Sequence, residues 1–265
     1  MSKGGRISLI IISIFFILSI ASPMLDMQNP YEINLDSINL PPSTNHFFGT
    51  DNKGRDIFSR VVYGAKISIG VSIAGAVISA FFGLSIGIIS GYFGGRIDSL
   101  LMGFVDFALS FPSLLLAIAI SIALPSGIYT VMIAIASVNW TSFARMIRGH
   151  VMTIRGMAFI DAARAIGCGN LRILIYHIAP QCITLSLVMM GIKLGGLILT
   201  EAALSFLGLG VQPPTPTWGY MVSANRAYIL TSPWMVIFPG AAISITAFCF
   251  NIIGENLSKK YEIKN

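Results

Sequence analysis

The sequence contains little charge. Asp, Glu, Lys and Arg make up only 11% of its 265 residues, whereas 55% are hydrophobic. An ordinary soluble domain carries about a quarter charged residues, so this composition excludes one and indicates an integral membrane protein. The net charge is +6, but the basic residues are spread along the chain. This spread argues against nucleic acid as a partner and favours basic loops beside membrane helices in contact with lipid.

Several motifs of metal-binding and catalytic proteins are also missing. The three cysteines are scattered and form no CxxC pair, which argues against a disulfide framework or a zinc site. The sequence contains no GxxxxGK(S/T) phosphate loop, no HExxH and no paired carboxylates within an apolar segment. His46, His150 and His177 are interpreted as separate surface residues. We therefore expect a chain that holds no metal or other cofactor and is not an enzyme.

Six apolar segments are long enough to cross a bilayer, which needs about 20 residues. A signal peptide is the alternative for the first of them, but its length favours a retained helix. The sequence thus predicts an all-α, polytopic membrane protein with six transmembrane helices. They are residues 7–25, 67–95, the two parts of 107–144 on either side of Pro125-Ser126-Gly127, 182–203, and a segment that contains 241–254.

Polar segments between these spans form the predicted loops. Residues 26–66 form an extracytoplasmic loop that ends in an amphipathic lead-in, and residues 96–106 form a short loop. With both termini inside, the inside segments hold eleven Lys and Arg residues and the outside segments five. The positive-inside rule therefore predicts a multi-pass protein of the cell membrane with cytoplasmic termini. We divide the chain into an N-terminal helix and loop (1–66) and a transmembrane domain (67–265) with a cytoplasmic loop at 145–181.

The most distinctive cytoplasmic stretch is 155–180. Phe159, Ala162, Ala163 and Ile166 recur at the spacing of one helical face, and Gly167 then interrupts the helix. A second apolar stripe follows before Pro180. A pair of short helices with a small-residue face suits the groove of another protein. The pattern alone also allows a loop that only covers helix ends.

Part of this stretch resembles a known motif. Asp161-Ala162-Ala163, Gly167, Ile178 and Pro180 are similar to the EAA loop of binding-protein-dependent ABC importer permeases. The usual loop begins with Glu and has Leu before its Pro, so Asp161 and Ala179 depart from it. Further segments resemble the dipeptide, oligopeptide and nickel permeases of the "C" type. They are residues 48–56, 59–60, 63–65, 91–98, 111–112, 201–210, 218–219 and 250–254, so that the resemblance covers almost the whole chain.

This resemblance implies a type I ABC importer permease. Such a subunit pairs with a homologous permease to enclose the path, while two ABC ATPase subunits bind and hydrolyse ATP-Mg. An extracytoplasmic binding protein delivers the substrate. Asp161, Ala162, Ala163, Gly167, Ile178 and Pro180 would then belong to the coupling helices that an ATPase subunit holds. The implied substrates are di- or oligopeptides, with nickel or a nickel chelate as the alternative. A stand-alone channel or secondary transporter is a remoter alternative.

Two charged residues lie within the fifth predicted span. Lys193 and Glu201 are about two helical turns apart and fall on roughly one face. A Lys near the middle of a span is costly and faces a cavity or a partner charge. Lys193 therefore either snorkels or pairs with a second permease, or it lines the translocation path with Glu201 and meets a substrate carboxylate.

Two further patterns concern packing and the membrane interface. Gly70, Gly75, Gly83, Gly87 and Gly91 recur largely at four-residue spacing along the second span, which predicts close helix packing. The aromatic residues between the last two spans, Trp218, Tyr228 and Trp234, are predicted to be interfacial anchors.

Overall fold

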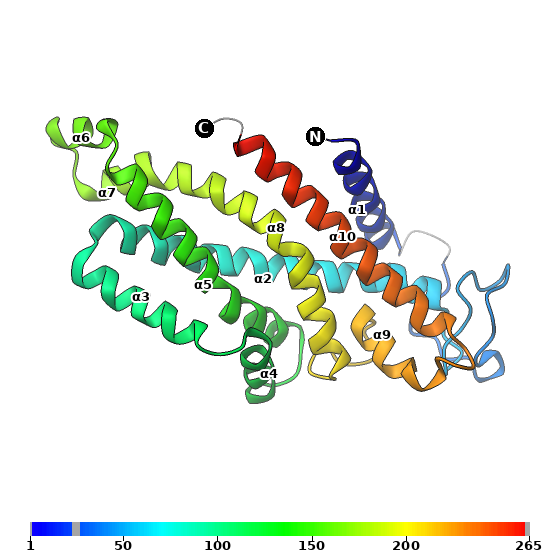
Figure 1. The fold of residues 1–265 in the computed structure, drawn as a ribbon. Coiled ribbons are helices and arrows are strands. Elements are labelled where there is room, and N and C mark those ends of the chain that lie inside the picture. Colours follow the sequence, from blue (N-terminus) through cyan, green and yellow to red (C-terminus); the bar gives the residue numbers. More distant parts are fainter. Residues whose placement is uncertain (1, 23–26, 263–265) are drawn as a thin grey trace.

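The computed structural model describes residues 2–22 and 27–262, and Figure 1 shows that they form a bundle of helices. The all-α prediction is confirmed. An isolated antiparallel bridge between Thr50 and Asp56 closes a turn just before the second helix. The α-helices are α1 (Lys3–Ala21), α2 (Ile57–Phe93), α3 (Gly95–Leu109), α4 (Ser113–Ala123), α5 (Ile128–Arg155), α6 (Ala158–Ala165), α7 (Asn170–Ile173), α8 (Ala179–Phe206), α9 (Trp218–Asn225) and α10 (Trp234–Glu262).

Five helical segments in the described ranges are long and apolar enough to cross a membrane. They are α1, α2, α5, α10 and the continuous stretch from α7 to α8. α3 and α4 give a sixth crossing if they count as one span, because together they meet the same criteria although they are bent by 87°. The predicted number of six therefore agrees with the structure. The end of the first predicted span, residues 23–25, lies outside the described residues.

The boundaries of several predicted loops are wrong. α2 begins at Ile57, so the lead-in at residues 59–66 is part of the spanning helix, and the division at residue 66 falls inside it. Residues 96–106 lie in α3, and α5 continues to Arg155, so the connecting segment starts only at Gly156. Each of these expected loops rests on its charged residues. In α3 and α5 some of these charges have partners on the neighbouring helix instead, as with Asp98 on α3 and Arg148 on α5.

Four of the five predicted packing glycines bring α2 against α5. A Cβ at Gly83 would lie 2.3 Å from the Phe143 Cβ, and one at Gly91 would lie 2.8 Å from the Arg148 carbonyl oxygen. Gly75 and Gly87 make equally close approaches to α5, whereas Gly70 faces open space. Larger side chains at the four contact positions would push the two helices apart, which is how small residues promote helix packing in membranes.

α8 and α10 pack antiparallel through glycines. Gly191 meets Gly254, and Gly195 meets Ala247 and Asn251 farther back along α10. At the N-terminus, the Ser2 backbone N–H donates to Asn256 Oδ1 at 2.9 Å. Consequently the start of α1, the end of α10 and the start of α8 lie at the same end of the bundle, together with α6 and α7 (Figure 1).

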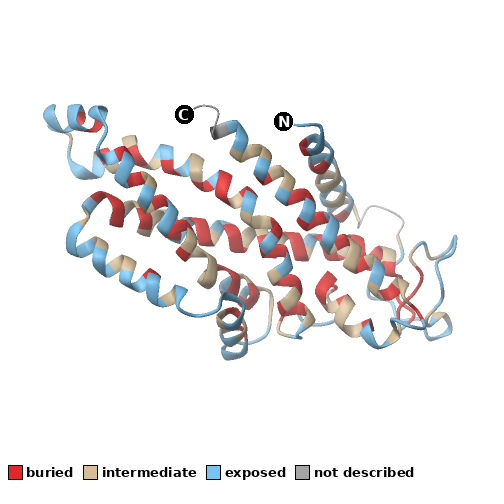
Figure 2. Ribbon diagram, in the orientation of Figure 1, coloured by how far each residue is buried: buried red, intermediate tan, exposed pale blue. Residues whose placement is uncertain are grey.

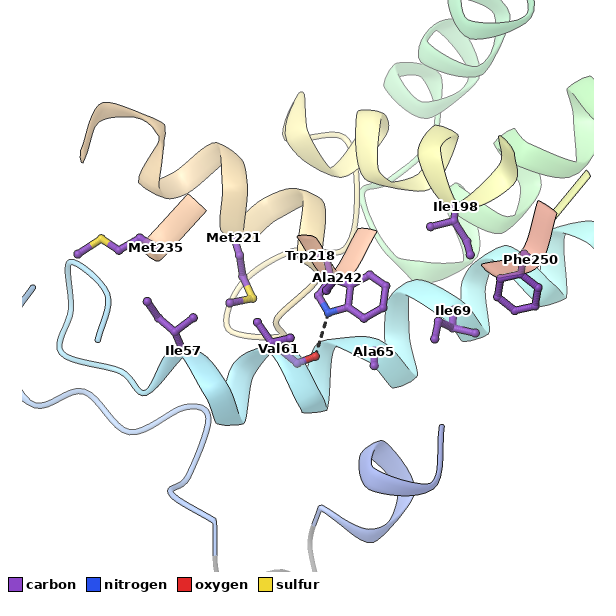
Figure 3. Packing of buried hydrophobic residues seen from close by; sticks show 10 residues of the cluster. All are labelled: Ile57, Val61, Ala65, Ile69, Ile198, Trp218, Met221, Met235, Ala242 and Phe250. Carbon is purple, nitrogen blue, oxygen red and sulfur yellow. Dashed lines mark hydrogen bonds between the residues drawn. The ribbon is translucent and has the colours of Figure 1, made fainter. Parts of the chain in front are cut away.

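The opposite end is closed by a core around Trp218 on α9. Trp218 is fully buried, and its indole Nε1–H donates to the Val61 carbonyl oxygen at 2.9 Å (Figure 3). Its predicted role as an interfacial anchor is therefore wrong. α9 is tied to α2 by a second bond, from the Trp218 N–H to Ser68 Oγ at 3.2 Å. The core consists of Ile57, Val61, Ala65, Ile69, Ile198, Trp218, Met221, Met235, Ala242 and Phe250.

Carboxylates order the chain before α2. Asp51 accepts hydrogen bonds from the Lys53 N–H at 2.8 Å and the Arg55 Nε–H at 2.8 Å, which closes a tight turn. Asp56 caps α2 by accepting from the Ser59 N–H at 2.7 Å, and it also lies 3.1 Å from His46 Nδ1. N-terminal caps of this type satisfy backbone donors that have no partner within the helix.

Candidate functional site: the helical segment between α5 and α8

The segment between α5 and α8 forms a small projection at one end of the bundle (Figure 1). α6 ends in a Schellman motif: the Gly167 N–H donates to the Arg164 carbonyl and the Cys168 N–H donates to the Ala163 carbonyl. Gly167 adopts φ +85°, a conformation that glycine takes without steric cost. The predicted interruption of the helix at Gly167 is confirmed. The chain then runs through α7 and a wider π-helical turn at Leu174–Ile178 into α8.

One face of this segment packs against the bundle. Ile160 and Ala163 on α6, Ile173 on α7, and Ile178 are buried against α2 and α5. Their cluster also contains Tyr92, Ile147, Val151, Ile154 and Cys182. A face of medium-sized aliphatic residues fixes the position of two helices that are too short to be stable alone.

The other face exposes apolar side chains. Figure 2 shows most of α6 and α7 as exposed, and Ile166, Leu171 and Tyr176 are 81%, 71% and 71% exposed. Ala162 is exposed as well, whereas its neighbour Ala163 is only 5% exposed. The prediction that both alanines share one outward face is therefore wrong. Successive side chains on a helix point about 100° apart. Ala163 therefore packs against α2 and α5, whereas Ala162 points away from them.

Polar contacts at the edge of the segment hold it to the end of α2. The Tyr92 hydroxyl donates to Asn170 Oδ1 at 2.7 Å, and the Arg164 guanidinium lies 5.9 Å from the centre of the Tyr92 ring. Asp161 and Arg164 form an exposed ion pair at 3.2 Å. Such a pair adds little to stability, so the Asp161 carboxylate remains accessible to another protein.

The two charged residues of α8 do not form a joint site. Glu201 is fully buried, and its Oε1 accepts a hydrogen bond from Ser205 Oγ at 2.7 Å. Lys193 is half-buried, and within the described ranges it makes no ion pair with Glu201 or any other acidic residue. Glu201 thus lies between packed helices in this structure. A role for Lys193 in the path stays a prediction.

Metal-ligand clusters and hydrolase motifs give no second candidate site. In residues 2–22 and 27–262 no three His, Cys, Asp or Glu side chains lie close enough to hold a metal ion. The sequence Gly83-Leu84-Ser85-Ile86-Gly87 matches the GxSxG pattern of hydrolases, but it lies inside α2. There Ser85 Oγ donates to the Phe81 carbonyl at 2.8 Å. This serine is part of a packed helix and not of a strand-to-helix turn.

Sequence reasoning missed a polar stripe on α5. The groove beside it is lined on α5 by Ser142, Arg145, Met146, Gly149, His150 and Thr153, with Leu109 of α3 and Leu185 of α8 at its sides. The signal was present in the sequence, because these positions recur at helical spacing. The expected loop at 145–181 obscures this spacing, because α5 continues to Arg155.

The chain matches one protein family and several named relatives. Residues 83–263 match the family described as binding-protein-dependent transport system inner membrane component. The dipeptide transport system permease protein DppC of Alkalihalophilus pseudofirmus is 43% identical over 97% of this chain and 84% of that protein. The oligopeptide permease OppC of Bacillus subtilis is 38% identical over the same shares. The glutathione permease GsiD of Escherichia coli is 40% identical over 88% of this chain and 76% of that protein.

Solved structures share the fold. A chain of the inward-facing MetNI methionine ABC transporter superposes with a TM-score of 0.61 at 15% identity, covering 76% of this chain and 95% of that one. A chain of an amino acid ABC transporter gives a TM-score of 0.57, also at 15% identity, over 77% and 94%. These likenesses confirm the predicted type I importer permease fold.

Proposed function

Because this chain belongs to the family of inner membrane components of binding-protein-dependent transport systems, and is thus a permease subunit of an ABC importer, we propose that it carries dipeptides or short oligopeptides across the cell membrane. The observation that carries the proposal is the identity of 38–43% to dipeptide and oligopeptide permeases along nearly the whole chain. A permease for glutathione, itself a short peptide, is also a relative. The substrates named for these relatives share a peptide backbone.

The segment at residues 155–180 is the part that couples this permease to an ATPase subunit. Its inner face is packed, so a force applied to it passes to α2, α5 and α8. Its outer face presents Ala162, Ile166 and Leu171, which no other described residue covers. Exposed apolar residues gathered on one surface are typical of a protein interface. Closure of the ATPase would shift this rigid unit and switch the bundle between two states.

The remaining partners and the orientation follow from the same proposal. A homologous permease encloses the other half of the path, two ATPase subunits hold ATP-Mg, and an extracytoplasmic protein delivers the peptide. The start of α1 and the end of α10 lie at the end that carries the coupling segment. The excess of Lys and Arg in the segments at that end supports a cytoplasmic location for it.

Uptake by the complete importer tests the function. Proteoliposomes that contain both permeases, the ATPase subunits and the binding protein should accumulate a radiolabelled dipeptide only with ATP. Omission of the binding protein should abolish accumulation. Accumulation of nickel without accumulation of peptide would contradict the proposed substrate. Uptake that needs neither ATP nor the binding protein would instead indicate a channel or a secondary transporter.

A further inference from the structure

A groove separates the middle of α1 from the rest of the bundle. At its start α1 packs closely against α10, where a Cβ on Gly5 would lie 2.9 Å from the Asn256 side chain. From residue 9 to residue 18, however, α1 carries Ile, Leu or Phe at every position but Ser13. Close helix contact in membranes needs small residues, so these larger side chains hold the helices apart. A groove of about 360 Å³ lies there between α1, α2 and α10.

The lining and size of this groove suit a hydrocarbon chain. All twelve residues that line it are Ile, Leu, Val, Phe or Ala. A peptide or an ion in the groove would find no side-chain partner for its polar groups, which is costly. A cavity of about 150 Å³ accommodates benzene, so this groove has room for roughly a dozen carbon atoms. A helix is about 10 Å across and two turns of it occupy about 800 Å³, so a helix of another subunit is too large.

The groove is continuous with the lipid-facing surface of the bundle. α1, α2 and α10 are each long and apolar enough to cross a membrane. Ile14 on α1 and Ile245 on α10 line the groove and are also 51% and 43% exposed, so they stand at its mouth. Ile10 and Ile17, one helical turn to either side of Ile14, extend the same exposed surface along α1. Acyl chains of the membrane that lie against this surface therefore reach the mouth of the groove.

The floor of the groove belongs to the core around Trp218. Val61 and Ala242 are members of both, and they are only 3% and 4% exposed. Phe15, which also lines the groove, packs edge to face against the Trp218 ring with the centroids 5.9 Å apart. The Val61 carbonyl accepts the indole N–H (Figure 3). Whatever fills the groove therefore adds dispersion contacts to side chains that hold Trp218 in place.

We propose that the groove between α1, α2 and α10 binds an acyl chain of a membrane phospholipid, and that this chain completes the packing between α1 and the core around Trp218. The chain enters sideways, between Ile14 and Ile245. A chain in the bilayer is already in an apolar medium, so binding gains little from the hydrophobic effect. The gain comes from close contact with the twelve lining side chains, and selectivity comes from the shape of the groove. The site does not depend on which substrate the importer carries.

Lipid retention by the complete importer tests the site. The importer is reconstituted with phosphatidylethanolamine that has brominated acyl chains, washed in detergent, and weighed by native mass spectrometry. Ala241→Phe should retain one phospholipid fewer than the unmodified importer, because the added ring fills the groove. Ser244→Phe is the matched control and should retain the lipid, because Ser244 is exposed on α10 and does not line the groove.

Two results of this experiment would overturn the proposal. One is equal retention by the two variants, or no retained lipid in the unmodified importer. The other is retention by the isolated subunit alone, which would show that the partner permease covers the groove.

Fluorescence detects the chain without any change in the groove, and so decides the matter even if Ala241→Phe fails to assemble. In a chain with Trp140→Phe and Trp234→Phe, Trp218 is the remaining tryptophan. Trp218 is fully buried and contacts Phe15 at the floor of the groove. Its emission should be quenched in liposomes with brominated acyl chains relative to liposomes with the same lipid unbrominated. Equal emission in the two lipids would mean that the groove holds no acyl chain.

Discussion

The two apolar clusters at the ends of the bundle differ in construction. The cluster around Trp218 gathers side chains from α2, α8, α9 and α10 about one buried indole, with its N–H bonded to Val61 (Figure 3). The cluster beneath α6 and α7 is made mainly of isoleucines and supports a projection whose outer side is exposed. The first cluster therefore joins long helices to one another. The second fixes the position of a small element that presents apolar residues to a partner.

The largest expected effect is a loss of stability when the indole of Trp218 is removed from the cluster that joins the long helices. Trp218→Ala leaves a large cavity and removes the hydrogen bond to the Val61 carbonyl, and should lower the free energy of unfolding by about 3–5 kcal/mol. The melting temperature of the purified subunit in detergent, and its level in the membrane, would show the loss. Trp140→Ala is the control, because Trp140 is only half-buried on the side of α5 towards α3. Equal losses of stability in the two variants would mean that the Trp218 cluster contributes no more to the stability of the bundle than a half-buried tryptophan does.

Substitutions of Ala163 and Ala162 test the inner and the outer face of the coupling segment separately. Ala163→Trp should overpack the cluster beneath α6 and destabilise the subunit by about 1–3 kcal/mol. Ala162→Trp should leave stability unchanged but abolish ATP hydrolysis stimulated by the loaded binding protein. Thermal melting and ATPase assays on the reconstituted importer distinguish the two outcomes. Normal stimulation in the Ala162→Trp importer would refute docking through this face.

A smaller effect is expected where an outward apolar side chain is made polar. Ile166→Ser should weaken the affinity of the permeases for the ATPase subunits by about tenfold, since burial of an isoleucine contributes about 1.5–3 kcal/mol when complete. Leu230→Ser is a matched control, because Leu230 is 94% exposed just before α10, at the other end of the bundle. Affinity is measured by titrating ATPase subunits onto immobilised permeases. A similar loss of affinity with Leu230→Ser would show that the ATPase subunits do not bind specifically at the end of the bundle that carries Ile166.

The smallest effect concerns the hydrogen bond between Tyr92 and Asn170. Tyr92→Phe removes one bond at the edge of the coupling segment and should cost about 1 kcal/mol, because Asn170 is exposed and water can replace the hydroxyl. Amide hydrogen exchange in residues 158–173 should then be roughly fivefold faster, while exchange around Trp218 stays the same. Faster exchange at both ends would show that the two clusters unfold together.

The number of spans and their approximate positions were predictable from the sequence. Long apolar runs are required wherever a helix crosses lipid, so composition alone identifies them. The glycines of α2 were also predictable, because small residues at helical spacing permit close packing whichever helix is the neighbour. The boundaries at 57 and 155 were not. Whether a charge near a helix end points to water or to a partner depends on which helix lies beside it.

The two short helices at residues 155–180 and the break at Gly167 are predictable from the chain alone, since periodicity and a glycine are local properties. By contrast, it is the packing against α2 and α5 that turns Ala163 towards the bundle and leaves Ala162 facing outward. Packing also encloses Glu201 and brings Arg145 and Asp106, distant in the chain, into an exposed ion pair between α5 and α3. The physical reason is the same for each. A helical pattern shows that a face exists, but the choice between neighbouring helix, partner protein and water is made by the packing of the whole bundle.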